Sequence, residues 1–208
     1  EVKFGKEAQD EIYEGAKIVA DAIASSLGPN GKTALIEGFG GNSYTVTKDG
    51  VSIGKAVGKL KNQYQNIGGN LVKNIASESA KVGDGTTTAS VLGRSMLENG
   101  RKYIASGVKV SDLKKGIDCA TKLAIEKIKA KSKEIRNETD ILNIATIASN
   151  NDEKIGKLVS EAYSQIGEDG ILTVEDSPKT ETYLEFVEGM QFNNGYESQY
   201  FVNNTDRM

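Results

Sequence analysis

Apolar residues recur at steps of three and four along most of this chain, which is the spacing of one face of an α-helix. The first such stripe covers residues 8–27, and the second begins at Tyr64. Further stripes follow a glycine-rich string at 83–88 and then occupy residues 89–100, 111–128, 141–148 and 155–166. The sequence therefore predicts a fold made mainly of amphipathic helices.

Short strand patterns interrupt the helices. Residues 33–37 read as a strand and residues 44–47 as its return strand, with glycines between them. Because Asp49-Gly50 is a turn signal, we expect a small antiparallel unit with Asp49 at its tip. Residues 171–175 and 183–187 are predicted as two more strands. The expected class is mostly α with small β elements (α+β).

Local signals set the expected ends of two helices. Gly100 is a candidate C-cap for the helix after residue 88, with Leu92 and Met96 facing inward. Ser111 is a candidate N-cap for the next helix. The lysine-rich residues 127–133 predict a solvated connector at a domain junction.

Two absences limit the chemistry. The 208 residues contain no histidine and one cysteine, Cys119. Ser-His-Asp and Cys-His catalysis, His-ligated metals and an intrachain disulfide are therefore excluded. Cys119 lies in a helical stripe, so we expect a buried, inert thiol in a reducing compartment. Carboxylates, hydroxyls, lysines and backbone amides remain, a set that suits phosphate and magnesium.

The charge balance and the short apolar runs exclude two classes of partner. The chain has 26 Lys and Arg against 29 Asp and Glu, a net charge of -3. No basic field favours nucleic acid. No apolar run approaches the roughly 18 residues that span a bilayer. We therefore expect no nucleic acid and no membrane among the partners.

The string Gly83-Asp84-Gly85-Thr86-Thr87-Thr88 stands at a predicted helix N-terminus. Free N–H groups, glycines and three hydroxyls together predict a phosphate cradle. Each hydrogen bond to a charged oxygen is worth roughly 1.5–3 kcal/mol. Asp84 supplies a carboxylate for Mg²⁺, which takes its other ligands from phosphate and water. The alternative is an ordinary capped helix start. No Walker A or G-x-G-x-x-G string occurs.

Two more glycine turns have both a structural and a functional interpretation. Leu27-Gly28-Pro29-Asn30-Gly31 follows a helix and by itself indicates a helix stop. Thr47-Lys48-Asp49-Gly50-Val51 is an ordinary turn by default. As a site, its Asp49 could orient or deprotonate an attacking water, and Lys48 could balance phosphate charge.

These motifs resemble those of the group I chaperonins, the GroEL/Hsp60/Cpn60 family, in the family's order and at nearly its spacing. The resemblance covers the whole chain, and the string at residues 83–88 is its most specific part. The matching segments are Val2-Lys3-Phe4-Gly5, Leu27-Gly28-Pro29, Thr47-Lys48-Asp49-Gly50-Val51, Gly83 to Thr88, Leu113-Lys114-Lys115-Gly116-Ile117-Asp118, Gly170-Ile171-Leu172-Thr173-Val174-Glu175-Asp176 and Val187-Glu188-Gly189-Met190-Gln191-Phe192.

The resemblance implies three domains. Residues 1–131 would be the N-terminal half of an equatorial, ATP-binding domain, residues 132–188 the outgoing segment of an intermediate domain, and residues 189–208 the start of an apical domain. The family's returning half, with a second catalytic aspartate and further nucleotide contacts, is not among these residues. The implied site is incomplete, so ATP hydrolysis by the fragment itself is not implied.

Site residues follow from the same resemblance. Asp49 matches an aspartate implicated in hydrolysis, and Asp84 matches the magnesium ligand. Ser26 stands where the family usually has threonine, which keeps the hydroxyl. The matched nucleotide contacts are Ser26, Leu27, Gly28, Pro29, Lys48, Asp84, Gly85, Thr86, Thr87 and Thr88.

Three aromatic residues match apical positions that bind non-native chains and the co-chaperonin. They are Tyr196, Tyr200 and Phe201. The alternative is that these side chains pack in the apical core. The chain departs from the family's usual pattern at Asn194, Glu197 and Gln199, where arginine, an apolar residue and proline are common.

The implied function is that of an ATP-dependent chaperone subunit, an ATP hydrolase that encapsulates unfolded polypeptides in a homo-oligomeric ring. ATP and Mg²⁺ would be its cofactors, with K⁺ a further candidate, and a GroES/Hsp10-like co-chaperonin its partner. A bacterial protein would be cytoplasmic, and a eukaryotic one would lie in the mitochondrial matrix or plastid stroma. The alternatives are a non-enzymatic helical binding or assembly module and a small nucleotide-dependent phosphotransferase.

Overall fold

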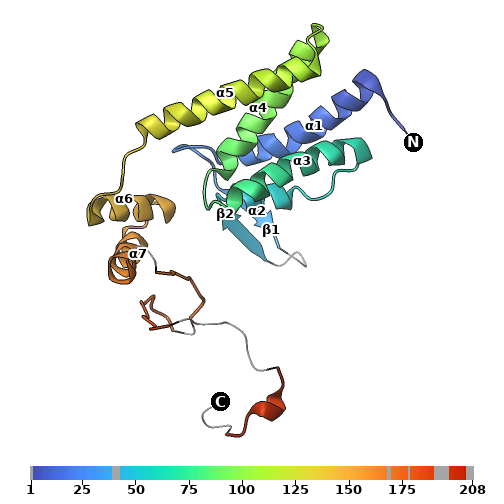
Figure 1. The fold of residues 1–208 in the computed structure, drawn as a ribbon. Helices are drawn as coiled ribbons and strands as arrows, with labels where there is room; N and C mark the ends of the chain where they lie inside the picture. Colours follow the sequence, from blue (N-terminus) through green and yellow to red (C-terminus); the bar gives the residue numbers. More distant parts are fainter. Residues whose placement is uncertain (1, 39–42, 168–169, 178, 190–196, 205–208) are drawn as a thin grey trace. The chain divides into compact units, whose positions relative to one another are not determined.

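The computed structural model describes residues 2–38, 43–167, 170–177, 179–189 and 197–204. Helices dominate the described chain, and the sheet has two strands, which confirms the mostly α class (Figure 1). The chain divides into two compact units, Glu1–Ile128 and Lys129–Met208. In the described part, no helix combines the length and apolar character needed to cross a bilayer.

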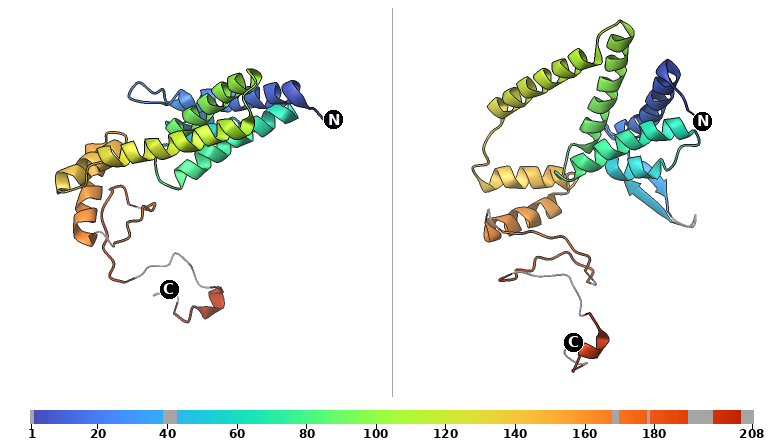
Figure 2. Two further views of the ribbon diagram at one scale, coloured as in Figure 1. Left: turned by 45° about the horizontal axis from the view of Figure 1, so that its top comes forward. Right: turned by 45° about the vertical axis from the view of Figure 1, so that its right-hand side comes forward.

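The core of the first unit lies between α1 (Gly5–Ala24) and α3 (Gln63–Ala80). The short α2 (Gly50–Ala56) and the longer α4 (Thr86–Ala105) pack beside them (Figure 2). The apolar stripe predicted for the first helix is buried as expected. The buried core residues are Ala16, Val19, Ala20, Ile23, Ile53, Val72 and Ala76.

Two glycines let α1 and α3 approach until their backbones touch. A Cβ added to Gly68 would lie 1.8 Å from the carbonyl oxygen of Ile12, and one added to Gly15 would lie 1.8 Å from that of Gln65. No side chain fits in that space, so these two positions fix the spacing of the helix pair. The sequence patterns assigned no role to either glycine.

Polar contacts hold α4 along α1. Arg94 pairs with Asp21, and Arg101 pairs with Asp10. The guanidinium carbon of Arg101 also lies 4.4 Å from the centre of the Tyr13 ring, a cation–π geometry. These contacts fix the position of α4 relative to α1, and α4 begins at the glycine-rich string.

The predicted hairpin is present. Strands β1 (Ala34–Glu37) and β2 (Tyr44–Thr47) pair antiparallel, with Leu35 opposite Val46. The prediction for Asp49 is wrong, because this residue is not at the hairpin tip but caps the N-terminus of α2. A carboxylate followed by free helix N–H groups favours a helix start over a turn.

The end predicted for α4 is also wrong. The helix continues through Gly100 to Ala105, and Ser90 is its only buried residue among those described. Leu92 and Met96, expected to face inward, are 53% and 50% exposed. The core beside α4 is filled mainly by α1 and α3, so most of the apolar stripe of α4 remains uncovered.

Helix α5 (Val110–Lys131) has no buried residue along its described length. It begins one residue before Ser111, so that serine lies inside the helix. A Cβ added to Gly100 would lie 3.5 Å from Leu113, so α5 approaches α4 near their connecting turn, and Figure 2 shows it then running clear of α1 and α3. Cys119 is exposed, so the buried-thiol prediction is wrong: no described element covers that part of α5.

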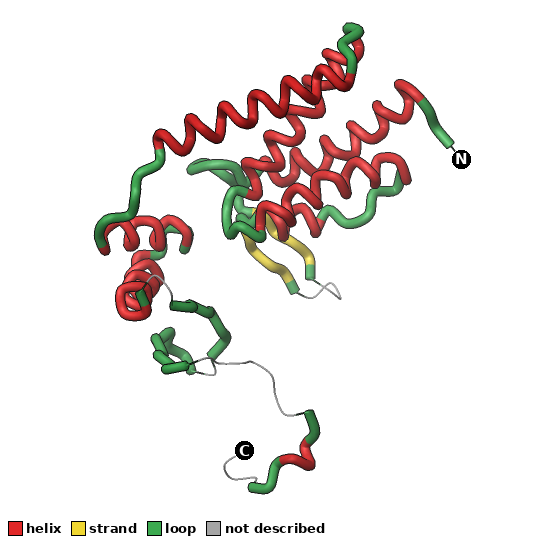
Figure 3. Tube along the Cα trace, in the orientation of Figure 1, coloured by secondary structure: helices red, strands yellow, loops and turns green. Residues whose placement is uncertain are grey.

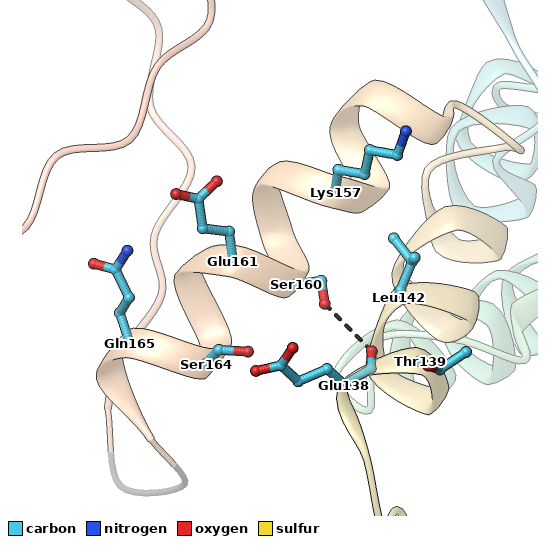
Figure 4. A pocket seen from close by; sticks show the side chains of 8 residues that line it. All are labelled: Glu138, Thr139, Leu142, Lys157, Ser160, Glu161, Ser164 and Gln165. Carbon is cyan, nitrogen blue, oxygen red and sulfur yellow. Dashed lines mark hydrogen bonds between the residues drawn. The ribbon is translucent and has the colours of Figure 1, made fainter.

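The second unit contains a pair of helices, α6 (Glu138–Ala148) and α7 (Glu153–Ile166). Asn137 and Asp152 cap their N-termini. The hydroxyl of Ser160 donates to the carbonyl of Glu138 at 3.4 Å, beside an open pocket of about 450 Å³ (Figure 4). Charged and polar side chains form most of its lining.

The two strands predicted after α7 are absent. Residues 170–177 and 179–189 form loops in the described chain (Figure 3). A strand is stable only when a neighbouring strand accepts and donates its backbone hydrogen bonds. Within these residues no such partner is present, so the β-favouring sequences at 171–175 and 183–187 do not form a ladder.

Candidate functional site

The turn after α1 brings one set of candidate residues to the surface. Lys32 N–H donates to the carbonyl of Ser25 at 2.8 Å, and Gly31 N–H donates to that of Gly28 at 2.9 Å, which closes the turn. Leu27, Gly28 and Pro29 are exposed on it, whereas Ser26 is half-buried. This side of the turn can meet a ligand with backbone atoms and the Ser26 side chain.

The second set lies between β2 and α2. Both carboxylate oxygens of Asp49 accept hydrogen bonds: Oδ1 from Val51 N–H at 3.2 Å, and Oδ2 from Ser52 N–H at 2.8 Å. The Ser52 hydroxyl also donates to Oδ2 at 2.6 Å. Lys48 precedes this cap and is exposed.

The environment of Asp49 favours its charged form. Partial burial of the carboxyl raises its pKa, but the hydrogen bonds from Ser52 and Val51 and the nearby charge of Lys55 lower it, and the net pKa lies below the ordinary value. A carboxylate with a lowered pKa is a weak base. Asp49 is therefore suited to orienting a water or cation more than to removing a proton.

The third set is the glycine-rich string before α4. Gly83 and Gly85 have φ values of 98° and 87°, in the left-handed region that favours glycine. Asp84 is exposed, and its Oδ1 accepts from Gly85 N–H at 2.6 Å. No side chain caps α4, whereas α2, α3, α6 and α7 all have a capping side chain. The first N–H groups of α4 therefore remain available to an anion.

Thr87 joins the three sets. Its Oγ1 lies 3.2 Å from Ser26 Oγ, a hydrogen bond between the first and third sets. A Cβ added to Gly50 would lie 2.9 Å from the same Oγ1 and 3.1 Å from Thr86 Cγ2. The cap at Asp49 therefore stands next to the start of α4. Motifs that are far apart in the sequence come together around one threonine.

In the part of the chain that the structure describes, two other candidate residues, Asp84 and Lys48, are not linked to the rest of the site. Among the described residues, no hydrogen bond or ion pair links Asp84 to the first or second set. None links Lys48 to the first or third set within the same residues. No three Asp, Glu or Cys side chains of the described chain cluster as a metal site. A Mg²⁺ ion held through Asp84 would thus take most of its ligands from phosphate and water.

The aromatic candidates lie near the C-terminal end. Tyr196 falls outside the described residues. Tyr200 and Phe201 lie in a 3₁₀ helix, Gln199–Phe201, and are 99% and 72% exposed. In the described chain these two side chains do not pack in a core. Whether they bind substrate stays a prediction.

A family model described as the TCP-1/cpn60 chaperonin family matches residues 19–207. The chain belongs to this family. Its fold is similar to that of a group III chaperonin crystallised in the open state, with a TM-score of 0.64 and 30% identity over 78% of this chain and 32% of that one.

A second chaperonin gives a similar result. The chaperonin gp146 from bacteriophage EL 2 (Pseudomonas aeruginosa), crystallised in the presence of ATP-BeFx, matches with a TM-score of 0.63 and 26% identity over 77% of this chain and 28% of that one. The chain therefore spans about a third of the length of these chaperonins.

Two contacts of this candidate site were not expected from the sequence. Ser52 stands three positions after Asp49, and an Asp N-cap followed by a serine in the first turn was a local signal that could have found it. The bond between Ser26 and Thr87 joins positions 61 residues apart. No local pattern predicts that bond.

Proposed function

We propose that these residues carry the N-terminal part of the ATP site of a group I chaperonin subunit. The observation that carries this proposal is the meeting of three glycine-bearing motifs around Thr87, at the uncapped start of α4. An uncapped helix N-terminus with flexible glycines before it favours phosphate. The related phage chaperonin, crystallised with ATP-BeFx, supports ATP as the nucleotide.

The residues present fit a triphosphate with Mg²⁺. The N–H groups of Thr86, Thr87 and Thr88 would bind phosphate oxygens, and Lys48 would add positive charge. The exposed carboxylate of Asp84 would hold Mg²⁺, with K⁺ a further candidate cation. The metal, when bound, would neutralise part of the phosphate charge.

Asp49 would act on water. Its two oxygens are fixed by the start of α2, and its pKa is low, so it remains ionised at neutral pH. We propose that it orients the attacking water. A second aspartate from a returning segment would complete the site, as the family resemblance implies.

We infer a ring-forming chaperone that captures unfolded polypeptides through exposed aromatic side chains, here Tyr200 and Phe201. Such side chains can bury apolar surface against an unfolded chain of any sequence. Gly189, with a φ of 103°, and the segment near Ser132 would serve as hinges between the proposed domains.

The group I assignment rests on the motif strings at residues 47–51, 83–88 and 187–192. It implies a separate GroES/Hsp10-like co-chaperonin. A bacterial protein would act in the cytoplasm, and a eukaryotic one in the mitochondrial matrix or plastid stroma. Pull-down of an Hsp10-like partner by the ATP-bound ring would support this assignment, and loss of the interaction without nucleotide is expected.

Calorimetry on the full-length subunit tests the nucleotide proposal. ATP is titrated with and without Mg²⁺, and we expect binding that strengthens at least tenfold with the metal. A subunit that does not bind ATP under either condition is instead a non-enzymatic binding or assembly module. Phosphorylated product from a small acceptor would indicate a phosphotransferase.

A further inference from the structure

Helix α4 has little apolar contact with the core around α1. Among the described residues, Ser90 is the only buried residue of α4, and Leu97 is partly buried against the core. Leu92 and Met96 are about half exposed. Because apolar contact is non-directional, so little of it determines the position of α4 along α1 only weakly. Polar contacts between the two helices are therefore the main determinant of that position.

Charged residues of α4 meet α1 along one face. Arg94, Glu98 and Arg101 are spaced by four and three positions, which places them on the same side of the helix. Arg94 pairs with Asp21, and Arg101 pairs with Asp10. The lower-numbered arginine pairs with the higher-numbered aspartate, so α4 runs antiparallel to α1.

Tyr13 joins the two ion pairs. Its ring centre lies 4.4 Å from the guanidinium carbon of Arg101, and its hydroxyl hydrogen-bonds Glu98. The pKa of Glu98 lies below its ordinary value, chiefly because Lys102 donates to this carboxylate at 3.0 Å. Arg94 and Tyr13 lower this pKa further, so Glu98 is charged at neutral pH. We call the connected set the α1–α4 ladder; its members are Asp10, Tyr13, Asp21, Arg94, Glu98 and Arg101.

The two arginines of the ladder reach in opposite directions along α1. Their aspartate partners are eleven positions apart on α1, whereas Arg94 and Arg101 are seven positions apart on α4. At 1.5 Å per residue these spans are about 17 Å and about 11 Å. Sliding α4 either way along α1 would therefore stretch one of the two ion pairs. The ladder resists movement in both directions and so fixes the axial register of α4.

We propose that Arg94 and Arg101 are positioning residues: through the α1–α4 ladder they hold the axial register of α4, and with it the place of the helix start in the candidate site. Arg94 lies about two turns beyond that start, so it acts on a ligand there only through the helix. A Cβ added to Gly50 would lie 2.9 Å from Thr87 Oγ1, so the helix start has little room to shift. This inference rests on the proposed ATP site.

Double-mutant cycles on the full-length subunit test it. Calorimetry measures the affinity for Mg²⁺-ATP of Arg94→Met, which removes the charge and keeps an apolar side chain, of Asp21→Asn and of the double variant. We expect each single change to weaken binding about two- to fivefold, the range of a partly exposed ion pair. The double variant should bind no more weakly than the weaker single variant, because both changes remove the same pair. Asp10→Asn with Arg101→Met should behave in the same way.

A crossed combination is the matched control. Arg94→Met with Asp10→Asn removes one partner from each of two ion pairs, so its losses should multiply. Arg94→Lys keeps the charge and should retain most of the affinity. Unchanged affinity in every single variant would show that the inference is wrong, and so would multiplied losses in the matched doubles.

Val72→Ala separates register from stability. Val72 is fully buried between α1 and α3 and is not a member of the ladder. Its truncation should lower the unfolding temperature at least as much as Arg94→Met does and leave affinity for Mg²⁺-ATP unchanged. Equal losses of affinity in the two variants would mean that any destabilisation weakens the site, which overturns the inference.

Spin labels measure the register itself. In a Cys119→Ser subunit diluted into unlabelled subunits, nitroxides are attached at Gln9→Cys and Tyr103→Cys, two exposed positions on α1 and α4. Double electron–electron resonance should give one narrow distance, and adding Arg94→Met with Arg101→Met should shift or broaden it. Identical distance distributions would contradict the proposal whatever the affinities are. A subunit that keeps the narrow distance and loses it in the variant, but does not bind Mg²⁺-ATP, removes the proposed function and leaves the register role standing.

Discussion

Ser52 donates two hydrogen bonds to one oxygen of Asp49, from its hydroxyl at 2.6 Å and from its N–H at 2.8 Å. The same carboxylate that would act in hydrolysis therefore also starts α2. Structural and functional effects of changing Asp49 must be separated by experiment.

The pH dependence of stability should report the ionisation of Asp49. Its folded-state pKa is lowered, so its charged form stabilises the fold above the unfolded-state pKa, and this contribution is lost as pH falls below about 4. Asp49→Asn keeps a capping oxygen but cannot titrate. Wild type should exceed the variant in unfolding midpoint at pH 6 to 7, and the gap should close on acidification. A constant gap at all pH values would contradict the assigned environment.

Asp49→Ala should slow ATP hydrolysis more than it weakens ATP binding. Loss of an N-cap costs about 1 kcal/mol of stability, so part of any effect is structural. Asp152→Ala is the matched control, because Asp152 also caps a helix through two backbone N–H groups, at the start of α7. We expect both variants to lose similar stability and only Asp49→Ala to lose most of its kcat. Equal turnover in Asp49→Ala and wild type would remove the catalytic role.

Asp84→Ala should abolish the magnesium dependence of ATP binding in the full-length subunit. The carboxylate is exposed at the start of α4, where it is free to meet a cation carried by the phosphates. Asp112→Ala is the control, because Asp112 is an exposed carboxylate in the first turn of α5. Titrations at several Mg²⁺ concentrations measure the effect. An unchanged magnesium dependence in Asp84→Ala would show that the metal is held elsewhere.

Much of this fold was predictable because helical periodicity is a local signal. The apolar stripe through Ala16, Val19 and Ile23 is buried as predicted, and the hairpin has nearly the expected bounds. Predictions that depended on a neighbour went wrong. Cys119 is exposed and residues 171–175 form no strand, since burial and strand pairing need a partner that a local pattern cannot supply.

In the candidate site, too, local features were predictable and contacts between distant segments were not. The string at residues 83–88 predicted the start of α4, because glycines and threonines favour a helix N-terminus. Neither motif by itself predicts the contact between Ser26 and Thr87. Their contact depends on how α1 packs beside α4, where Arg94 pairs with Asp21 and Arg101 pairs with Asp10.

Gly68→Ala should destabilise the subunit strongly. The new Cβ would lie 1.8 Å from the Ile12 carbonyl oxygen, and backbone cannot move aside as a side chain can. We expect a loss of at least about 2 kcal/mol in the free energy of unfolding. Gly116→Ala is the matched control inside α5, where a Cβ meets nothing within 4 Å. It should raise helix stability by about 0.5–1 kcal/mol. Urea unfolding midpoints compare the two, and similar destabilisation would contradict the close contact of α1 and α3.

The isolated 208-residue chain should be poorly packed or aggregate. Helix α5 buries no residue in the described chain, and its apolar side chains at Ile117, Leu123 and Ile128 are exposed. Unpartnered apolar faces of this kind associate in water. Ile128→Lys should lower aggregation measured by light scattering, whereas Lys127→Arg, which keeps charge and apolar area, should not. A sharp cooperative melt of the monomeric chain would show that α5 needs no partner, and the apolar face would then have no structural role.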